Sequence, residues 1–310
     1  MPPSAVLPSG PLLGAHMSIA GGHHNAARAA QAAGMKTVQV FTKASHQWSA
    51  RPLTDSDVRA FRDALAEGGL VDPVAHVSYL INLASPDSQL WSRSIDSLTL
   101  ELERAEALGI EPVVAHPGSH LGSGEDAGLT RIAQALDQVH RRLPGLRARV
   151  TLESTAGQGS SLGYRLEHLA TILDRVLAPE RLAICLDTCH LFAAGYSWSD
   201  TASYNLLIDE VDRHVGIARV RVWHLNDSAR ECGSRVDRHA GIGCGRIGLE
   251  PFRALVNDRR FARLPMILET PKGTDSHGVD LDVVNRLALE RLIAGRPAAA
   301  PRRRRSARDG

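Results

Sequence analysis

The chain alternates short, almost continuously apolar runs with longer stretches in which apolar residues recur every three or four positions. Runs of the first kind are typical of strands buried on both faces of a parallel sheet. We predict eight such strands, at residues 12–18, 37–43, 72–79, 111–118, 148–155, 182–189, 218–227 and 264–271. Stretches of the second kind, clearest at residues 94–109 and 166–177, predict amphipathic helices between the strands.

Eight β-α units in roughly 280 residues favour a closed α/β barrel of the TIM (β/α)8 type. Because no shift in composition divides the pattern, we predict one catalytic barrel domain over residues 12–294. An open, doubly wound sheet is the alternative fold. It would need a sheet edge and a switch point, and the pattern indicates neither.

Composition is that of a soluble globular protein, with 43% hydrophobic and 23% charged residues. No apolar run approaches the roughly 18 residues that span a bilayer, so we expect no membrane segment. Residues 1–11 lack a basic start and carry prolines, which predicts a disordered leader rather than a signal peptide. The four cysteines form no C-x-x-C pair, and a reducing cytoplasm is the simplest location.

The net charge of +2 hides an uneven distribution. The low-complexity segment 295–310 holds six arginines and one aspartate and contributes +5, which leaves −3 for residues 1–294. We predict a disordered Arg-rich tail there, either adding affinity for phosphate backbones or serving only as a solvated tail. The barrel itself does not indicate nucleic-acid binding through its net charge. Any positive field must therefore be local.

Histidines and carboxylates stand where a barrel builds its active site, at the carboxyl ends of the strands. One such residue alone is more often structural than a ligand. Nine occur together, counting the loop after the seventh strand: His76, His116, Glu153, Asp187, His190, His224, Asp237, His239 and Glu269. The four carboxylates among them would repel one another without counter-charge, and bound divalent cations remove that cost.

The mixture of imidazole and carboxylate without cysteine indicates which metal is bound. It fits Zn²⁺, with Mn²⁺ or Fe²⁺ as further options, and argues against Ca²⁺ and Mg²⁺, which prefer oxygen ligands. Nine ligands are too many for one ion, so two or three ions are implied. Three divalent ions would exceed the charge of the four carboxylates by about +2, a field that attracts phosphate.

Eight motifs surround these positions, in order: "GAHMSIAGG", "HVSYLINLASP", "AHPGSHLG", "LESTAGQGSSLGY", "LDTCHLFAAGY", "HLNDS", "SRVDRHAGIG" and "LETPKG". From about Leu13 to Leu292, their order and spacing resemble the endonuclease IV family, trinuclear-zinc apurinic/apyrimidinic (AP) endonucleases on a TIM barrel. The resemblance implies the following zinc ligands: His76, His116 and Glu153 for one ion; Glu153, Asp187, His224 and Glu269 for a second; His190, Asp237 and His239 for a third.

The resemblance also implies a base-excision-repair activity. The phosphodiester bond 5′ to an abasic site would be hydrolysed by hydroxide held by the zinc ions and by Glu153 as catalytic residue. The products would be a 3′-hydroxyl and a 5′-deoxyribose phosphate, and 3′-phosphodiesterase trimming is expected too. The expected partner is double-stranded DNA with abasic sites or 3′-blocked ends. We expect a monomer without an obligatory protein partner.

Several positions bear on DNA contact. Tyr79 and Leu80 match family residues that wedge into the base stack beside the lesion, although a strand-end aromatic could instead pack on the barrel. His46 stands where the family often has an arginine, in a loop that enters the minor groove. The chain also departs from common family residues, outside the metal positions, at Val77, Ala240 and Cys244.

A glycine-rich stretch, residues 243–248, formally matches the G-x-G-x-x-G fingerprint of dinucleotide-binding proteins. That fingerprint needs its glycines directly after a strand. Here the predicted strand ends near residue 227, so the dinucleotide interpretation fails. We predict instead a loop that serves metal and phosphate, in which Gly241 and Gly243 let the backbone turn tightly and approach DNA.

Two other functions remain open. A metal-dependent sugar or sugar-phosphate isomerase of the same barrel superfamily would explain Glu153, Asp187 and Glu269. It would leave His76, His116 and the Asp237/His239 pair without a role. A non-catalytic lesion-binding protein is a different class of answer. It would tolerate loss of a ligand, and none is missing.

Overall fold

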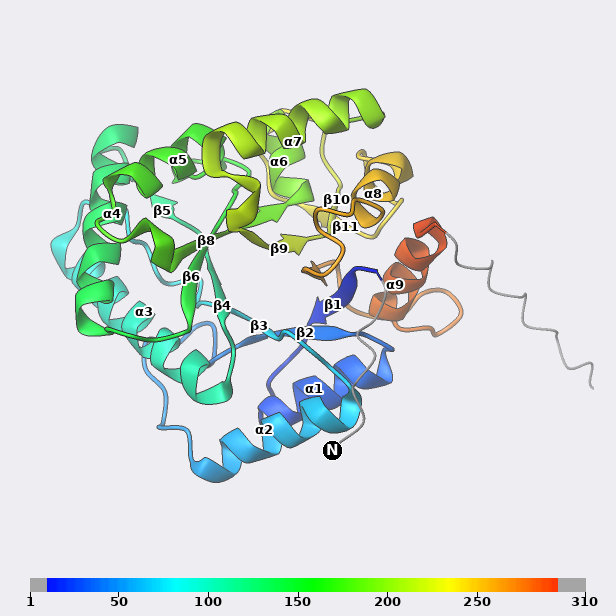
Figure 1. Ribbon diagram of the computed structural model, residues 1–310, viewed down its shortest axis with the longest axis horizontal. Coiled ribbons are helices and arrows are strands. Elements are labelled where there is room, and N and C mark those ends of the chain that lie inside the picture. The colour runs from blue at the N-terminus through cyan, green and yellow to red at the C-terminus, as the bar shows by residue number, and fades with distance from the viewer. Residues whose placement is uncertain (1–9, 295–310) are drawn as a thin grey trace, which may run out of the picture.

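Eight parallel strands close into a barrel in the computed structural model, which describes residues 10–294 (Figure 1). The order around the barrel is β1-β12-β9-β8-β6-β4-β3-β2, and β1 pairs with both β12 and β2. Closure confirms the TIM barrel and excludes the open sheet. The predicted leader, apart from Gly10 and Pro11, and the predicted tail 295–310 lie outside the described residues.

Each observed barrel strand lies inside a predicted run and is shorter than it. The barrel strands are β1 (Leu12–His16), β2 (Thr37–Phe41), β3 (Val74–His76), β4 (Pro112–Ala115), β6 (Arg149–Glu153), β8 (Leu182–Asp187), β9 (Val220–His224) and β12 (Pro265–Leu268). Two short antiparallel hairpins lie in the loops, formed by β5 (Gly118–Ser119) with β7 (Ser161–Leu162) and β10 (Asp227–Ser228) with β11 (His239–Ala240).

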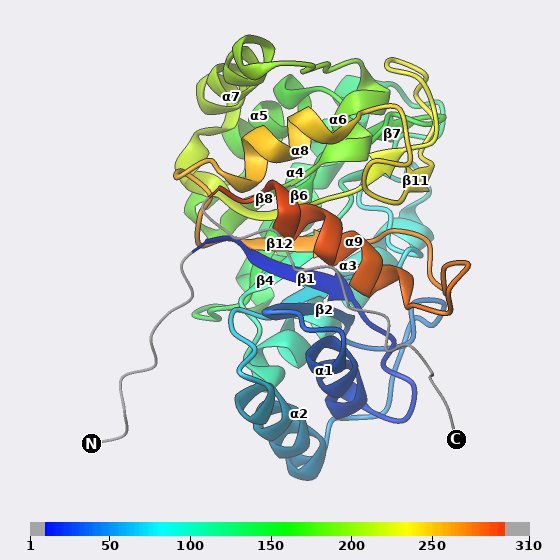
Figure 2. The same ribbon diagram turned by 90° about the vertical axis from the view of Figure 1, so that its right-hand side faces the viewer.

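Helices surround the barrel (Figure 2). They are α1 (His23–Ala32), α2 (Asp55–Gly68), α3 (Ser88–Leu108), α4 (Glu125–Arg142), α5 (Leu166–Arg175), α6 (Thr188–Ala194), α7 (Thr201–Val215), α8 (Leu249–Val256) and α9 (Leu281–Leu292). Polar side chains cap the first turn of several helices. Thr54 forms a capping box with Asp57 at the start of α2, and the Asp87 side chain accepts a hydrogen bond from the backbone N–H of Leu90 at the start of α3. None of the helices in residues 10–294 has the length and apolarity needed to cross a membrane.

The barrel interior explains where the site lies. Five inward-facing residues form a separate buried cluster: Val74, Val114, Cys185, Val222 and Ile267. Two positions after each comes a predicted site residue: His76, His116, Asp187, His224 and Glu269. Because residues i and i+2 of a strand face the same way, each site residue is the next inward-facing position towards the carboxyl end. The polar site therefore lies directly on the apolar filling of the barrel.

A buried ion pair connects two loops at that end. Lys43, just after β2, lies 3.0 Å from Glu101 of α3, and both side chains are fully buried. The same carboxylate accepts the backbone N–H of Ser78 at 2.9 Å. The pair thus ties together the loops that carry His46 and Tyr79.

Replacing Glu101 with alanine would leave the Lys43 ammonium buried without a counter-charge. We expect Glu101→Ala to lower the free energy of unfolding by about 3–5 kcal/mol, measured by urea denaturation. Glu103→Ala, at an exposed position on the same helix, should change it by less than about 0.5 kcal/mol. Equal effects of the two variants would show that the ion pair does not stabilise the loops.

Candidate metal centre

The structure brings the nine predicted site residues together at the barrel mouth. Their ligand atoms fall into overlapping groups within 4.8 Å. These groups include His76–His116–Glu153, Glu153–Asp187–His224–Glu269 and Asp187–His190–His239, and Asp237 forms another group with His239 and Cys189. Each position is thus within reach of a shared centre, although the sequence spreads them over nearly two hundred residues.

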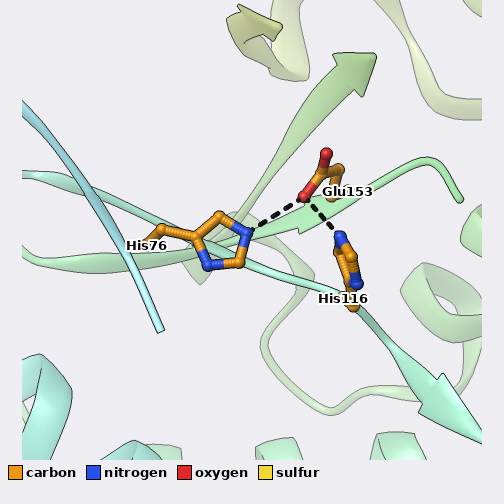
Figure 3. Close-up of side chains that lie close together, drawn as sticks. All are labelled: His76, His116 and Glu153. Carbon is orange, nitrogen blue, oxygen red and sulfur yellow. Dashed lines mark hydrogen bonds and ion pairs between the residues drawn. The ribbon is translucent and has the colours of Figure 1, made fainter. Parts of the chain in front are cut away.

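Glu153 lies in the middle of the site and is fully buried. Its Oε2 is 3.3 Å from His76 Nε2 and 3.0 Å from His116 Nε2 (Figure 3). Its Oε1 is 2.9 Å from His224 Nδ1 and 3.3 Å from His190 Nδ1. Burial by itself would raise the pKa of this carboxyl, but the surrounding histidines, His224 first, outweigh burial and hold the pKa well below its usual range. Glu153 is therefore a carboxylate.

A second part of the site forms around Asp237. His190 Nε2 lies 3.2 Å from Asp237 Oδ2, and His239 Nε2 lies 3.3 Å from Asp237 Oδ1. His239 is placed by the β10–β11 hairpin, in which it pairs with Ser228. His190 is placed by Asp187, whose Oδ1 accepts the His190 backbone N–H at 2.8 Å and so caps α6.

The hydrogen bonds of the imidazoles fit a metal centre. Four rings use one nitrogen to donate to an oxygen: His76 Nδ1 to Val77 O at 2.7 Å, His190 Nδ1 to Ser154 O at 2.8 Å, His239 Nδ1 to Glu269 O at 3.0 Å and His224 Nε2 to Gln39 Oε1 at 2.9 Å. The other nitrogen of each ring faces a carboxylate of the site. His239 Nε2 is buried without a hydrogen-bond partner among the described residues. Such rings are oriented as metal ligands are, and the donor set suits zinc.

Sequence reasoning missed two residues of this site, His16 on β1 and Gln39 on β2. Gln39 Nε2 donates to Glu269 Oε1 at 2.6 Å and to His16 Nδ1 at 2.9 Å. The spacing of residues along the strands indicates both positions. They stand two positions after Gly14 and Thr37, which pair with each other in the barrel. The i+2 relation that holds for the other strands would have located them.

Comparisons with known proteins agree with the motifs. The sequence model of the family described as "Xylose isomerase-like TIM barrel" matches residues 27–288. The "Probable endonuclease 4" of Chloroflexus aurantiacus is 48% identical over 285 residues, which cover 92% of this chain and 99% of that protein. The crystal structure of endonuclease IV from Thermus thermophilus matches with a TM-score of 0.78 at 37% identity, covering 91% of this chain and 98% of that one. The chain belongs to the endonuclease IV family.

The fold extends beyond this family. A D-tagatose 3-epimerase-like protein matches with a TM-score of 0.67 at 17% identity, covering 90% of this chain and 96% of that one. At that identity the likeness shows only the fold. Membership of the endonuclease IV family therefore rests on the closer matches.

The glycine-rich loop of this endonuclease IV family member is organised around a buried carboxylate. Asp227 Oδ2 accepts the N–H groups of Gly243 and Gly245, each at 3.0 Å, and Oδ1 accepts that of Ile247 at 2.9 Å. A Cβ on Gly245 would lie 2.4 Å from Asp227 Oδ1, so only glycine fits there. Because these amides point inward at Asp227, the loop is not a dinucleotide cradle. Contact of Gly241 and Gly243 with DNA stays a prediction.

The residues predicted to meet DNA lie beside the metal centre. Tyr79 is 68% exposed, and its ring centroid is 5.8 Å from that of His76. Leu80 is half-buried and His46 is exposed. A cavity of about 310 Å³ adjoins the centre, and its lining includes His76, Tyr79 and His116. Tyr79 therefore stands out from the barrel wall at the entrance to the site.

Asp227 provides a test of the loop. Asp227→Asn keeps the shape of the side chain but replaces one accepting oxygen with a donor, so backbone amides of the loop lose their acceptor. We expect the free energy of unfolding to fall by about 2–4 kcal/mol and the 241–248 segment to become sensitive to limited proteolysis. Asp63→Asn, at an exposed position of α2, is the control. Unchanged stability and protection in Asp227→Asn would contradict this account of the loop.

Proposed function

We propose that this protein is a zinc-dependent AP endonuclease of DNA repair. It would hydrolyse the phosphodiester bond 5′ to abasic sites and leave a 3′-hydroxyl and a 5′-deoxyribose phosphate. The observation that carries the proposal is the fully buried Glu153 carboxylate, contacted by four histidines within a site of nine ligand-type residues. The names of its endonuclease 4 relatives support a nucleic acid as the substrate.

Three zinc ions would share the nine residues. His76, His116 and Glu153 would hold one ion, and His190, Asp237 and His239 another. Asp187, His224 and Glu269, together with Glu153, would hold the third. The chemistry that zinc supplies when bound is a lowered pKa of water and stabilisation of charge on the phosphate. Mn²⁺ or Fe²⁺ would also suit this donor set in one position.

The protein's own groups would orient the reaction. Glu153 is a carboxylate within reach of four imidazoles, and its side chain is fully buried. Its oxygens would accept a hydrogen bond from the attacking water and orient that water towards phosphorus. Because a charged group in such a site keeps its position without solvent reorganisation, its orienting effect is larger than in water.

Lesion selection would take place at the rim. The abasic nucleotide would leave the helix and enter the cavity beside His76 and His116, at least cost where no base must be unstacked. Tyr79 and Leu80 would occupy the stack beside the lesion, and His46 would approach the minor groove. A 3′-blocking group placed at the same phosphate would be removed by the same chemistry. The proposed activity therefore includes 3′-phosphodiesterase trimming.

The sugar-isomerase alternative fits the geometry less well. It needs one or two metals and the carboxylates at positions 153, 187 and 269. It assigns no role to His116 or to the Asp237–His239 pair, yet these lie in the same site. A non-catalytic lesion-binding protein would have no need for a complete ligand set.

A nicking assay tests the proposed activity. A duplex oligonucleotide with one abasic site should be cut on its 5′ side by zinc-loaded protein, and a polymerase should extend the product from its 3′-hydroxyl. Chelation should suppress cutting, and added zinc should restore it. An intact duplex is the control. Failure of fully zinc-loaded protein to cut would contradict the proposal.

Glu153 can be tested with an isosteric change. Glu153→Gln removes the charge that the four histidines surround, and we expect the nicking rate to fall on the order of 10³-fold. Circular dichroism should show a retained barrel. Glu103→Gln, at an exposed position, should cut at the wild-type rate. A Glu153→Gln variant with near wild-type activity would exclude the role proposed for this carboxylate.

A further inference from the structure

Gln39 is a fully buried amide in the barrel interior. Every polar group of its side chain has a partner. Nε2 donates to Glu269 Oε1 at 2.6 Å and to His16 Nδ1 at 2.9 Å. Oε1 accepts from His224 Nε2 at 2.9 Å. The amide thus connects two of the proposed zinc ligands, His224 at the end of β9 and Glu269 directly after β12.

The direction of these hydrogen bonds follows from Glu269. Glu269 Oε1 lies 2.6 Å from one end of the Gln39 amide and is an oxygen acceptor, so the amide nitrogen faces it. The reverse orientation would set two oxygens 2.6 Å apart. The amide oxygen consequently faces His224.

Facing an oxygen, His224 must carry a proton on Nε2. Its Nδ1 is then the nitrogen that faces the site, 2.9 Å from Glu153 Oε1 and 3.3 Å from Glu269 Oε2. Metal ions bind the unprotonated nitrogen of an imidazole, and the partner of the other nitrogen selects the tautomer. Because Gln39 Oε1 holds the proton on Nε2, Nδ1 is the His224 nitrogen left for a metal ion.

The acceptor that orients the His224 ring is of a different kind from the acceptors of the other three oriented rings. His76, His190 and His239 donate to backbone carbonyl oxygens, which no side-chain substitution removes. Among these four rings, His224 alone depends on a side chain. A change at position 39 should thus affect one part of the centre and leave the rest intact.

We propose that Gln39 is a positioning residue for metal binding. It sets the tautomer of His224 and the orientation of Glu269, and so controls the affinity of the ion held by Glu153, Asp187, His224 and Glu269. This inference rests on the proposed zinc centre.

Zinc titration against a competing chelator tests the inference in the full-length protein. Gln39→Leu has a similar volume and no hydrogen-bonding group. We expect one of three zinc ions to bind about 10–100-fold more weakly, as for other lost partners of ligating residues, while the other two keep their affinity. The control is Gln134→Leu, at an exposed position of α4, which should bind all ions as the wild type does.

Nitrogen NMR of the histidine rings separates positioning from a general loss of structure. In zinc-loaded wild-type protein, the His224 signals should be those of a neutral ring protonated on Nε2 and not on Nδ1. Gln39→Leu should lose this preference. Gln39→Glu keeps an acceptor for His224 but sets a negative charge against Glu269, so we expect the tautomer to be retained and zinc to bind more weakly. If Gln39→Leu does not fold, the His224 tautomer and the zinc affinity of Gln39→Glu test the proposal.

The outcomes for this inference and for the function are distinct. Wild-type protein that binds no zinc, or that binds zinc and does not cut abasic DNA, would contradict the proposed function. Wild-type protein that binds and cuts, alongside Gln39 variants with unchanged zinc affinity and tautomer, would overturn only the role of Gln39. A uniform loss of all three ions in Gln39→Leu would also overturn it, because the role is specific to one ion.

Discussion

The Glu153 carboxylate is buried away from water, and this constraint organises the site. A carboxylate removed from water is very unfavourable unless it is paired and hydrogen-bonded. Here the compensation comes from His76, His116, His190 and His224, each from a different barrel segment. Three further carboxylates lie close by, so the imidazoles alone balance the charge only if they are protonated. Metal ions would balance the same charge with neutral imidazoles, which is why the donor set suits a multinuclear centre.

The barrel makes this concentration of polar groups tolerable. Below the site, the interior is filled by small and branched side chains such as Val114 and Val222, and the strands that carry them also carry the ligands two positions later. Polar residues in the loops then connect the site to the helices, as Lys43 does with Glu101. The rigid strands position the ligands, and the loops position the groups that would meet DNA.

Much of this arrangement could be predicted from residue order. Strands buried on both faces are almost continuously apolar, so all eight were recognisable, although their ends were predicted too far into the loops. Histidines and carboxylates at strand ends are chemically conspicuous, so the nine candidates were also recognisable. Gln39 was not, because glutamine is an uncommon ligand and its importance lies in two contacts with residues far along the chain. His16 was not recognisable either, because the residue two positions before it, Gly14, is not one of the apolar side chains that fill the barrel.

The sequence by itself determined the barrel, the chemistry of the ligands and the family, because periodicity and residue type are local properties of the chain. Only the tertiary structure decided which nitrogen of each imidazole faces the centre, and that the glycine-rich loop encloses Asp227. The physical reason is that these features depend on hydrogen bonds between groups brought together by folding. Gln39 and His224 are 185 residues apart, and Glu153 and His224 are 71 residues apart. No local pattern records such a pairing.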